Sequence, residues 1–105
     1  MRAGQIDRRI VIERNTTTDD SLGEPIDSWA TLATVWAEVR EPRGREFFAG
    51  GQRVAEVDTV FIIRHRTDVT AKDRINYDSK LYDIQFIGEI GRRVGLEIMA
   101  KAQGL

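Results

Sequence analysis

The sequence has 105 residues, and its 16 Lys and Arg residues against 17 Asp and Glu residues leave a formal net charge of −1. This length fits one domain, residues 1–105, with a thin core, and the balanced charge argues against a general nucleic-acid binder, which usually has a strongly basic face. The absence of cysteine excludes a disulfide framework, a thiolate metal site and a cysteine nucleophile. We expect neither a secretory signal nor a membrane span, because no apolar run approaches the roughly 20 residues that a spanning helix needs.

The first part of the chain predicts two strands separated by a long polar loop. Residues 8–14 are short and β-branched, with isoleucines alternating onto one face, which favours a strand. Residues 15–28 are rich in Gly, Pro, Asn, Asp and Ser and predict a loop with a turn at Leu22-Gly23. Residues 34–41 return to apolar alternation, and the proline that follows ends this second strand. The loop is either functional or a tolerated surface hairpin.

Residues 43–56 are the one helical candidate, because Phe47 and Val54 fall at helical spacing with a glycine between them. Gly50 and Gly51 weaken this prediction, since each costs a helix about 1 kcal/mol relative to alanine. We therefore expect a marginal helix whose order depends on a neighbour.

The last part of the chain predicts four strands at short spacing, joined by polar turns. In the third of these, Tyr82, Ile84 and Phe86 are expected on one face. The four predicted strands are residues 57–66, 74–77, 80–88 and 96–101. In total, the sequence predicts a mainly β protein, namely a small antiparallel β-barrel of about six strands with one short helix and long loops.

No motif for catalysis or cofactor binding stands out. The one histidine, His65, lies in a predicted strand between two arginines, and no nucleophile is placed beside it by any motif. Asp19-Asp20 is the closest acidic pair, but it falls in a polar loop where nothing would shift a pKa. No phosphate-binding glycine motif is present. We expect no enzyme activity, no cofactor and no metal.

Two small clusters could contact nucleic acid, since aromatic rings interleaved with arginines can stack on bases. The first consists of Arg43, Arg45, Phe47 and Phe48, and the second is Arg92-Arg93. Both are small, and the phenylalanines equally suit a core or a protein contact.

An ordered set of segments resembles the head–tail joining family of tailed phages, which contains the head-closure or stopper proteins of the connector. The set covers nearly the whole chain and comprises residues 5–14, 34–39, Pro42 with 44–48, 61–70, 74–77 and 81–84. The resemblance implies a small β-barrel with a helix and long loops. It also implies a ring, commonly of twelve copies, that lies below the portal and adaptor proteins, closes the filled head and joins it to the tail.

In stopper members of that family, a loop closes the central channel, and the resemblance places this loop at about residues 42–56. The channel-closure and ring-contact residues are then Arg43, Arg45, Glu46, Phe47, Phe48, Gly50, Gly51 and Gln52. A second set in the first loop could dock on a neighbouring ring or face the channel. This docking set is Asp19, Asp20, Leu22 and Glu24.

The expected partners are other copies of this chain, portal and adaptor proteins, and tail-completion or tail-tube proteins. DNA is expected to pass without tight binding, which suits the absence of a basic stripe. The expected location is the virion connector, and the host cytoplasm during assembly. Two alternatives remain open, a tail-completion or tail-attachment protein of similar fold, and a nucleic-acid-binding barrel of the OB type.

Overall fold

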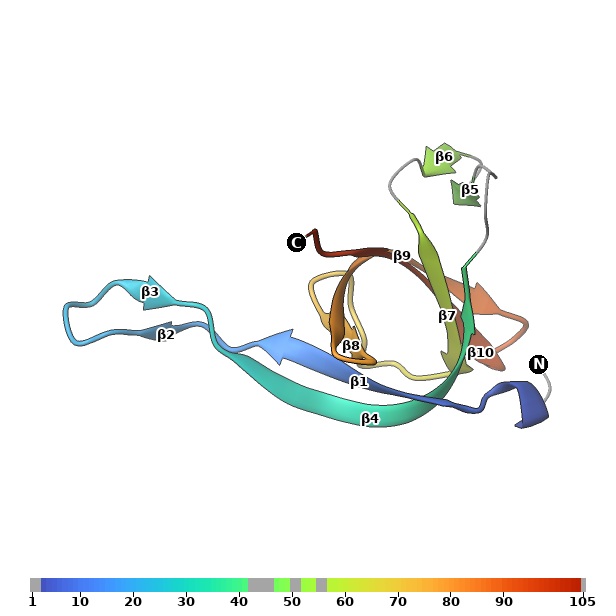
Figure 1. The fold of residues 1–105 in the computed structure, drawn as a ribbon, viewed down its shortest axis with the longest axis horizontal. Coiled ribbons are helices and arrows are strands. Elements are labelled where there is room, and N and C mark those ends of the chain that lie inside the picture. The colour runs from blue at the N-terminus through green and yellow to red at the C-terminus, as the bar shows by residue number, and fades with distance from the viewer. Residues whose placement is uncertain (1–2, 42–46, 50–51, 55–56, 105) are drawn as a thin grey trace.

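The computed structural model describes residues 3–41, 47–49, 52–54 and 57–104 (Figure 1). Six strands form a closed antiparallel barrel in the order β1-β4-β7-β10-β9-β8, with β8 pairing back to β1. The barrel strands are β1 (Arg8–Asn15), β4 (Trp29–Arg40), β7 (Thr59–Arg64), β8 (Arg74–Tyr77), β9 (Lys80–Ile90) and β10 (Gly95–Ala102). The prediction of a mainly β protein built on a six-stranded antiparallel barrel is therefore confirmed.

Three short pieces complete the described chain. A 3-10 turn, η1 (Ala3–Gln5), precedes β1. The strands β2 (Thr18–Asp19) and β3 (Pro25–Ile26) form one two-stranded sheet, and β5 (Phe47–Ala49) and β6 (Gln52–Val54) form another. Both small sheets stand outside the barrel wall in Figure 1.

The barrel interior is filled by the inward-facing residues that the strand alternation predicts. Phe61 is fully buried and lies between two tyrosines, with ring centroids 5.9 Å from Tyr77 and 5.1 Å from Tyr82 in edge-to-face geometry. The other large side chains that are fully buried are five isoleucines, namely Ile10, Ile12, Ile63, Ile75 and Ile98. Phe61 is thus the centre of the core.

Strand β7 is buried on both faces. Its outward residues Val60 and Ile62 pack with Val57 and Met99 in a second cluster, against which Phe86 and Ile90 also pack. The register between β9 and β10 shifts by one residue opposite Met99 and Ala100, because Met99 pairs with Phe86 whereas Ala100 pairs with Ile84. This β-bulge turns Phe86 toward the second cluster.

The prediction that Phe86 shares a face with Tyr82 and Ile84 is therefore wrong. The extra residue at the bulge, Gln85, reverses the alternation of β9, so that Ile84 packs in the interior cluster and Phe86 in the outer one.

The predicted helix over residues 43–56 is also wrong at the positions that the structure describes. Residues 47–49 and 52–54 form the hairpin strands β5 and β6, in which Phe47 pairs with Val54 and Ala49 with Gln52. The physical reason is that Gly50-Gly51 is a far better hairpin connection than a helix interior. The described ranges contain no α-helix.

Burial of Tyr82 leads to a prediction about alkaline stability. Burial raises the pKa of the Tyr82 phenol above its ordinary value, and the charges of Glu41 and Asp58 raise it further. Because the pKa is raised in the folded state, the protonated Tyr82 phenol contributes fully to the free energy of unfolding below about pH 10. This contribution is lost as the pH rises above that value. We expect Tyr82→Phe, which keeps the ring, to reduce this alkaline loss.

Urea unfolding of the two proteins from pH 8 to pH 11 measures the effect. The curves should run parallel up to about pH 9.5 and diverge above it, with the variant losing less. Equal losses at pH 11 would contradict the assignment.

Candidate functional site

The polar segment between β1 and β4 is an ordered hairpin arm that projects from the barrel (Figure 1). The pairing of β1 with β4 runs to Asn15 and Trp29, and the Thr16 N–H then donates to the Ser28 carbonyl at 2.6 Å. Thr18 pairs with Ile26 further out. The arm therefore continues the barrel wall, and it accounts for an elongated molecule of 48 × 27 × 25 Å.

Asp20 shapes the tip of the arm. Its carboxylate accepts hydrogen bonds from the Leu22 N–H at 2.8 Å and the Glu24 N–H at 2.9 Å. Gly23 adopts a φ of 82°, a conformation that side-chain-bearing residues rarely take, and its N–H donates to the Asp20 carbonyl at 3.0 Å. The predicted Leu22-Gly23 turn is confirmed, and Asp20 fixes its shape.

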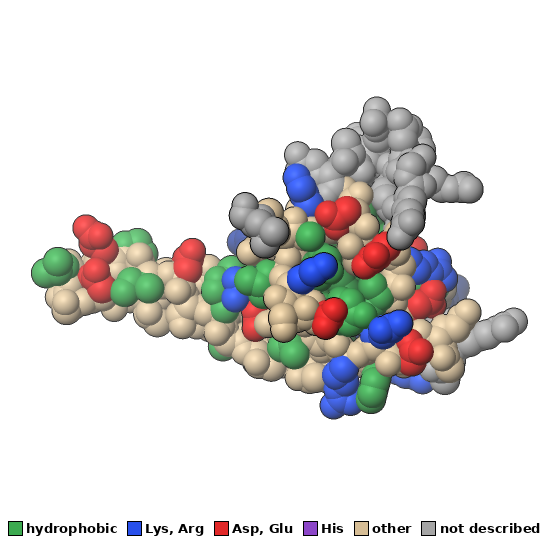
Figure 2. All heavy atoms as spheres, viewed as in Figure 1, with side chains coloured by type: hydrophobic (Ala, Val, Ile, Leu, Met, Phe, Trp, Pro, Cys, Tyr) green, Lys and Arg blue, Asp and Glu red, His purple; other side chains and the backbone are tan. Residues whose placement is uncertain are grey.

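The arm exposes apolar side chains among acidic ones, as Figure 2 shows. Residues 16–28 contain four acidic residues and no basic one. Leu22 is 85% exposed and Ile26 46% exposed, although such side chains gain by leaving water. An ordered, acidic arm with exposed apolar side chains is suited to a protein contact.

An ion-pair cluster fixes the root of the arm to the loop between β7 and β8. Arg14 donates to the two carboxylate oxygens of Asp73 at 3.0 and 3.1 Å and also to the Asp68 carbonyl. Asp73 is buried and accepts a further hydrogen bond from the Thr70 N–H at 2.9 Å. Such a bidentate pair fixes orientation as well as distance.

The same cluster includes Arg66, which donates to Asp68 at 2.9 and 3.0 Å. This hydrogen-bonded guanidinium lowers the pKa of the Asp68 carboxyl. The hydrogen bond to Asp73 likewise raises the pKa of Arg14.

A second contact at the root involves Arg74 on β8. Its Nε donates to Glu13 at 2.7 Å, and its guanidinium lies 4.0 Å from the centre of the Trp29 ring. Arg74 thereby links the strand that enters the arm to the strand that leaves it. Together the two contacts fasten the root of the arm to the barrel.

The structure brings the predicted docking residues together. Asp19, Asp20, Leu22 and Glu24 all lie at or beside the tip of the arm. The anchoring residues Arg14 and Asp73 were not predicted from the sequence, because their partnership spans distant parts of the chain and no local pattern signals it.

The predicted channel-closure residues are only partly described. Phe47 and Phe48 lie in β5 and Gln52 lies in β6. Arg43, Arg45, Glu46, Gly50 and Gly51 lie outside the described residues.

The described residues offer little for catalysis or metal binding. They contain no group of three or more His, Cys, Asp or Glu residues that could hold a metal ion. His65 is half-buried, and its backbone N–H donates to the Val94 carbonyl at 3.3 Å. No helix in the described part of the chain is long and apolar enough to cross a membrane.

The fold is a small closed barrel with a projecting acidic arm, a shape suited to contacts with other proteins. The chain belongs to the phage head completion protein family, whose profile matches residues 1–103. It is 33% identical to head completion protein gp7 of Enterobacteria phage HK97 over 107 residues, which cover 96% of each chain. The family favours the connector hypothesis over the nucleic-acid-binding barrel.

Two solved structures share the fold. A protein of Shigella flexneri 2a, determined in solution, superposes with a TM-score of 0.73 at 23% identity, over 97% of this chain and 96% of that one. A chain in the virion of a native gene transfer agent particle superposes with a TM-score of 0.62 at 21% identity, over 92% of this chain and 94% of that one.

Proposed function

We propose that this protein is a structural subunit of a tailed-phage head–tail connector, where it forms a ring below the portal and adaptor and joins the filled head to the tail. The observation that carries the proposal is the ordered acidic arm with Leu22 exposed, in a chain that belongs to the head completion family. Its role is then structural, with no catalytic step, and its place is in the virion after assembly in the host.

A ring requires two different contact surfaces on each copy, because head-to-tail contacts close a cycle. The arm and the barrel wall are two such surfaces, one projecting and one broad. Tail-completion or tail-tube proteins would then contact the ring on the side away from the head.

The segment between β4 and β7 is proposed to take part in channel closure or ring contact. It includes Phe47 and Phe48, which lie in β5. This strand pairs with β6 in a short hairpin outside the barrel (Figure 1).

We expect Phe47→Ala with Phe48→Ala to leave the melting temperature within a few degrees and to impair assembly or DNA retention in heads. If the double variant instead fails to fold, the two rings belong to the core and the proposal for this segment is overturned.

DNA is proposed to pass this ring without tight binding. The formal net charge of −1 supports this, because affinity for phosphates rests on clustered cations. Binding to single-stranded DNA with submicromolar affinity and strong salt dependence would overturn the proposal in favour of the OB-type alternative.

The experiment that tests the connector role is a mass measurement in solution, alone and with the portal–adaptor complex from the same genome. Light scattering should show that copies of this chain join the complex as a ring. A chain that does not associate with the complex would contradict the proposed function.

A further inference from the structure

The outer wall of the barrel carries a row of two arginines with a tryptophan between them. Arg9 on β1 pairs with Trp36 on β4, and the Arg9 guanidinium lies 4.6 Å from the centre of the Trp36 ring. Ala37 pairs with Ile63 on β7, so continuing this register by one residue places Arg64 on the other side of Trp36. We call these three residues the Arg–Trp–Arg row.

The row is open to solvent although its composition suits a buried contact. Trp36 is 51% exposed, and both arginines are exposed. A shallow pocket beside the row is lined by Ile6, Asp7, Trp36 and Arg64. Tryptophan and arginine are the residues that most often dominate the binding energy of protein interfaces.

The arm is opposite to this row in charge and also exposes apolar side chains. The row contributes two positive charges and an aromatic surface, whereas the arm has four acidic residues and no basic one. The exposed Leu22 and Ile26 of the arm match the apolar face of Trp36. The two surfaces are therefore complementary in charge and in apolar character.

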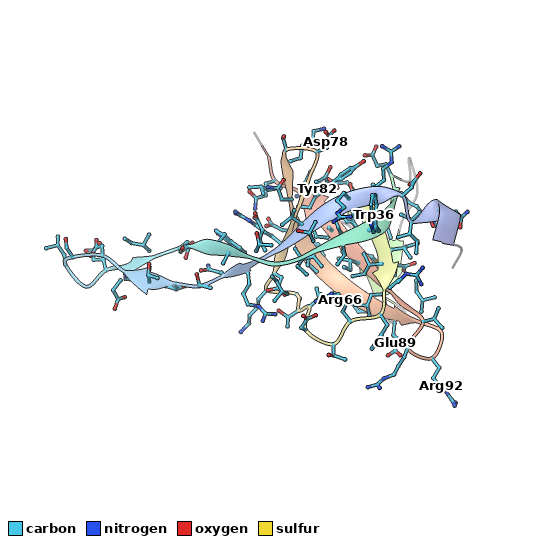
Figure 3. The ribbon with its side chains drawn as sticks, turned by 90° about the horizontal axis from the view of Figure 1, so that it is seen from below. Trp36, Arg66, Asp78, Tyr82, Glu89 and Arg92 are labelled. Atoms are coloured by element: carbon cyan, nitrogen blue, oxygen red, sulfur yellow. The ribbon has the colours of Figure 1, made fainter. Side chains whose placement is uncertain are left out.

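The arm cannot reach the row of its own subunit. Figure 3 shows Trp36 on the barrel wall near the N-terminal end, with the arm pointing away from it. About 12 extended residues separate Leu22 from Trp36, which at about 3.3 Å per residue is on the order of 40 Å. Two complementary surfaces at opposite ends of one molecule are what a head-to-tail contact requires.

We propose that the acidic tip of the arm of one subunit docks on the Arg–Trp–Arg row of the next copy, and that this contact closes the ring. The proposal rests on the connector ring proposed above and adds the contact that builds it. Asp19 and Glu24 would face the two arginines, while Leu22 would cover Trp36. Asp20 stays engaged in shaping the turn.

Charge reversal with rescue tests this contact. Asp19→Lys with Glu24→Lys reverses the arm tip and spares Asp20, and Arg9→Glu with Arg64→Glu reverses the row. Each pair of changes alone should reduce the number of copies that join the portal–adaptor complex at least tenfold. A chain with all four changes, in which the two new lysines of the arm tip meet the two new glutamates of the row, should regain most of the assembly.

Cross-linking tests the same contact by distance, and the chain has no cysteine of its own to interfere. A chain with Leu22→Cys and Trp36→Cys, bound to the portal–adaptor complex and oxidised, should give a ladder of covalent multimers. The matched control replaces Trp36→Cys with Asp83→Cys, since Asp83 is exposed and lies on β9, which the barrel order places opposite β4. The control should give no ladder.

The two levels of the proposal fail differently. If the wild-type chain forms a ring but the reversed pairs assemble normally, or the fourfold chain is not rescued, the arm docks elsewhere and this inference is overturned while the connector role stands. A ladder of equal strength in the control also overturns the inference. If the wild-type chain forms no ring on the complex, the proposed function itself fails.

Discussion

Replacing Phe61 with alanine should lower the free energy of unfolding by about 3–5 kcal/mol, the usual cost of removing a large aromatic side chain from a core. Phe61 is fully buried and is the ring on which both Tyr77 and Tyr82 pack edge-on. A barrel interior closes around a fixed backbone, so the cavity collapses poorly. Since small domains are stable by only about 5–15 kcal/mol, the variant should be close to the limit of folding.

Urea unfolding followed by circular dichroism measures this loss. Phe61→Leu is the matched control, because it keeps most of the apolar volume and should cost about 1–2 kcal/mol. Equal and small losses in both variants would show that the core does not depend on the aromatic cluster.

Removing the arm should abolish assembly and leave the fold intact, in contrast to the Phe61 substitution, which should destabilise the fold. Residues 16–28 can be replaced by Asn-Gly, which joins the paired residues Asn15 and Trp29 through a two-residue hairpin turn. The interior cluster contains no residue of the replaced segment. We therefore expect the free energy of unfolding to change by less than about 1 kcal/mol, while recruitment to the portal–adaptor complex falls to background.

A full-length control separates the side chains from the arm itself. Leu22→Ser with Ile26→Thr keeps the hairpin and its charges and removes its exposed apolar surface. It should weaken recruitment without abolishing it. A truncated protein that unfolds would show that the arm stabilises the barrel, and one that assembles normally would remove the arm from the ring contact.

Period-two alternation in the sequence was enough to predict the barrel, because β1, β7 and β10 each contribute alternate apolar residues to the interior cluster. The sequence also predicted the turn between β8 and β9, because only two polar residues, Asp78 and Ser79, separate the two predicted strands. In the structure these residues adopt the positive φ angles of 52° and 64° that a tight hairpin needs. Local chemistry decides both features.

Features that depend on distant residues could not be predicted. The bulge at Gln85 is set by the register of β9 against β10, so the position of Phe86 required the pairing itself. The pair Arg14–Asp73 joins residues 59 positions apart. In residues 15–28, composition indicated only a polar loop, whereas the backbone extends the barrel wall into an ordered arm.

The arm and the segment proposed for channel closure share one strand. β4 begins at Trp29, where the arm ends, and finishes at Arg40, just before residues 42–56. Hydrogen bonds to β1 along the first part of β4 and to β7 along the last part hold it to the wall on both sides. A strand held in this way resists stretching, so a load on the arm tip would be transmitted along β4 to the chain that leads into the segment proposed for channel closure.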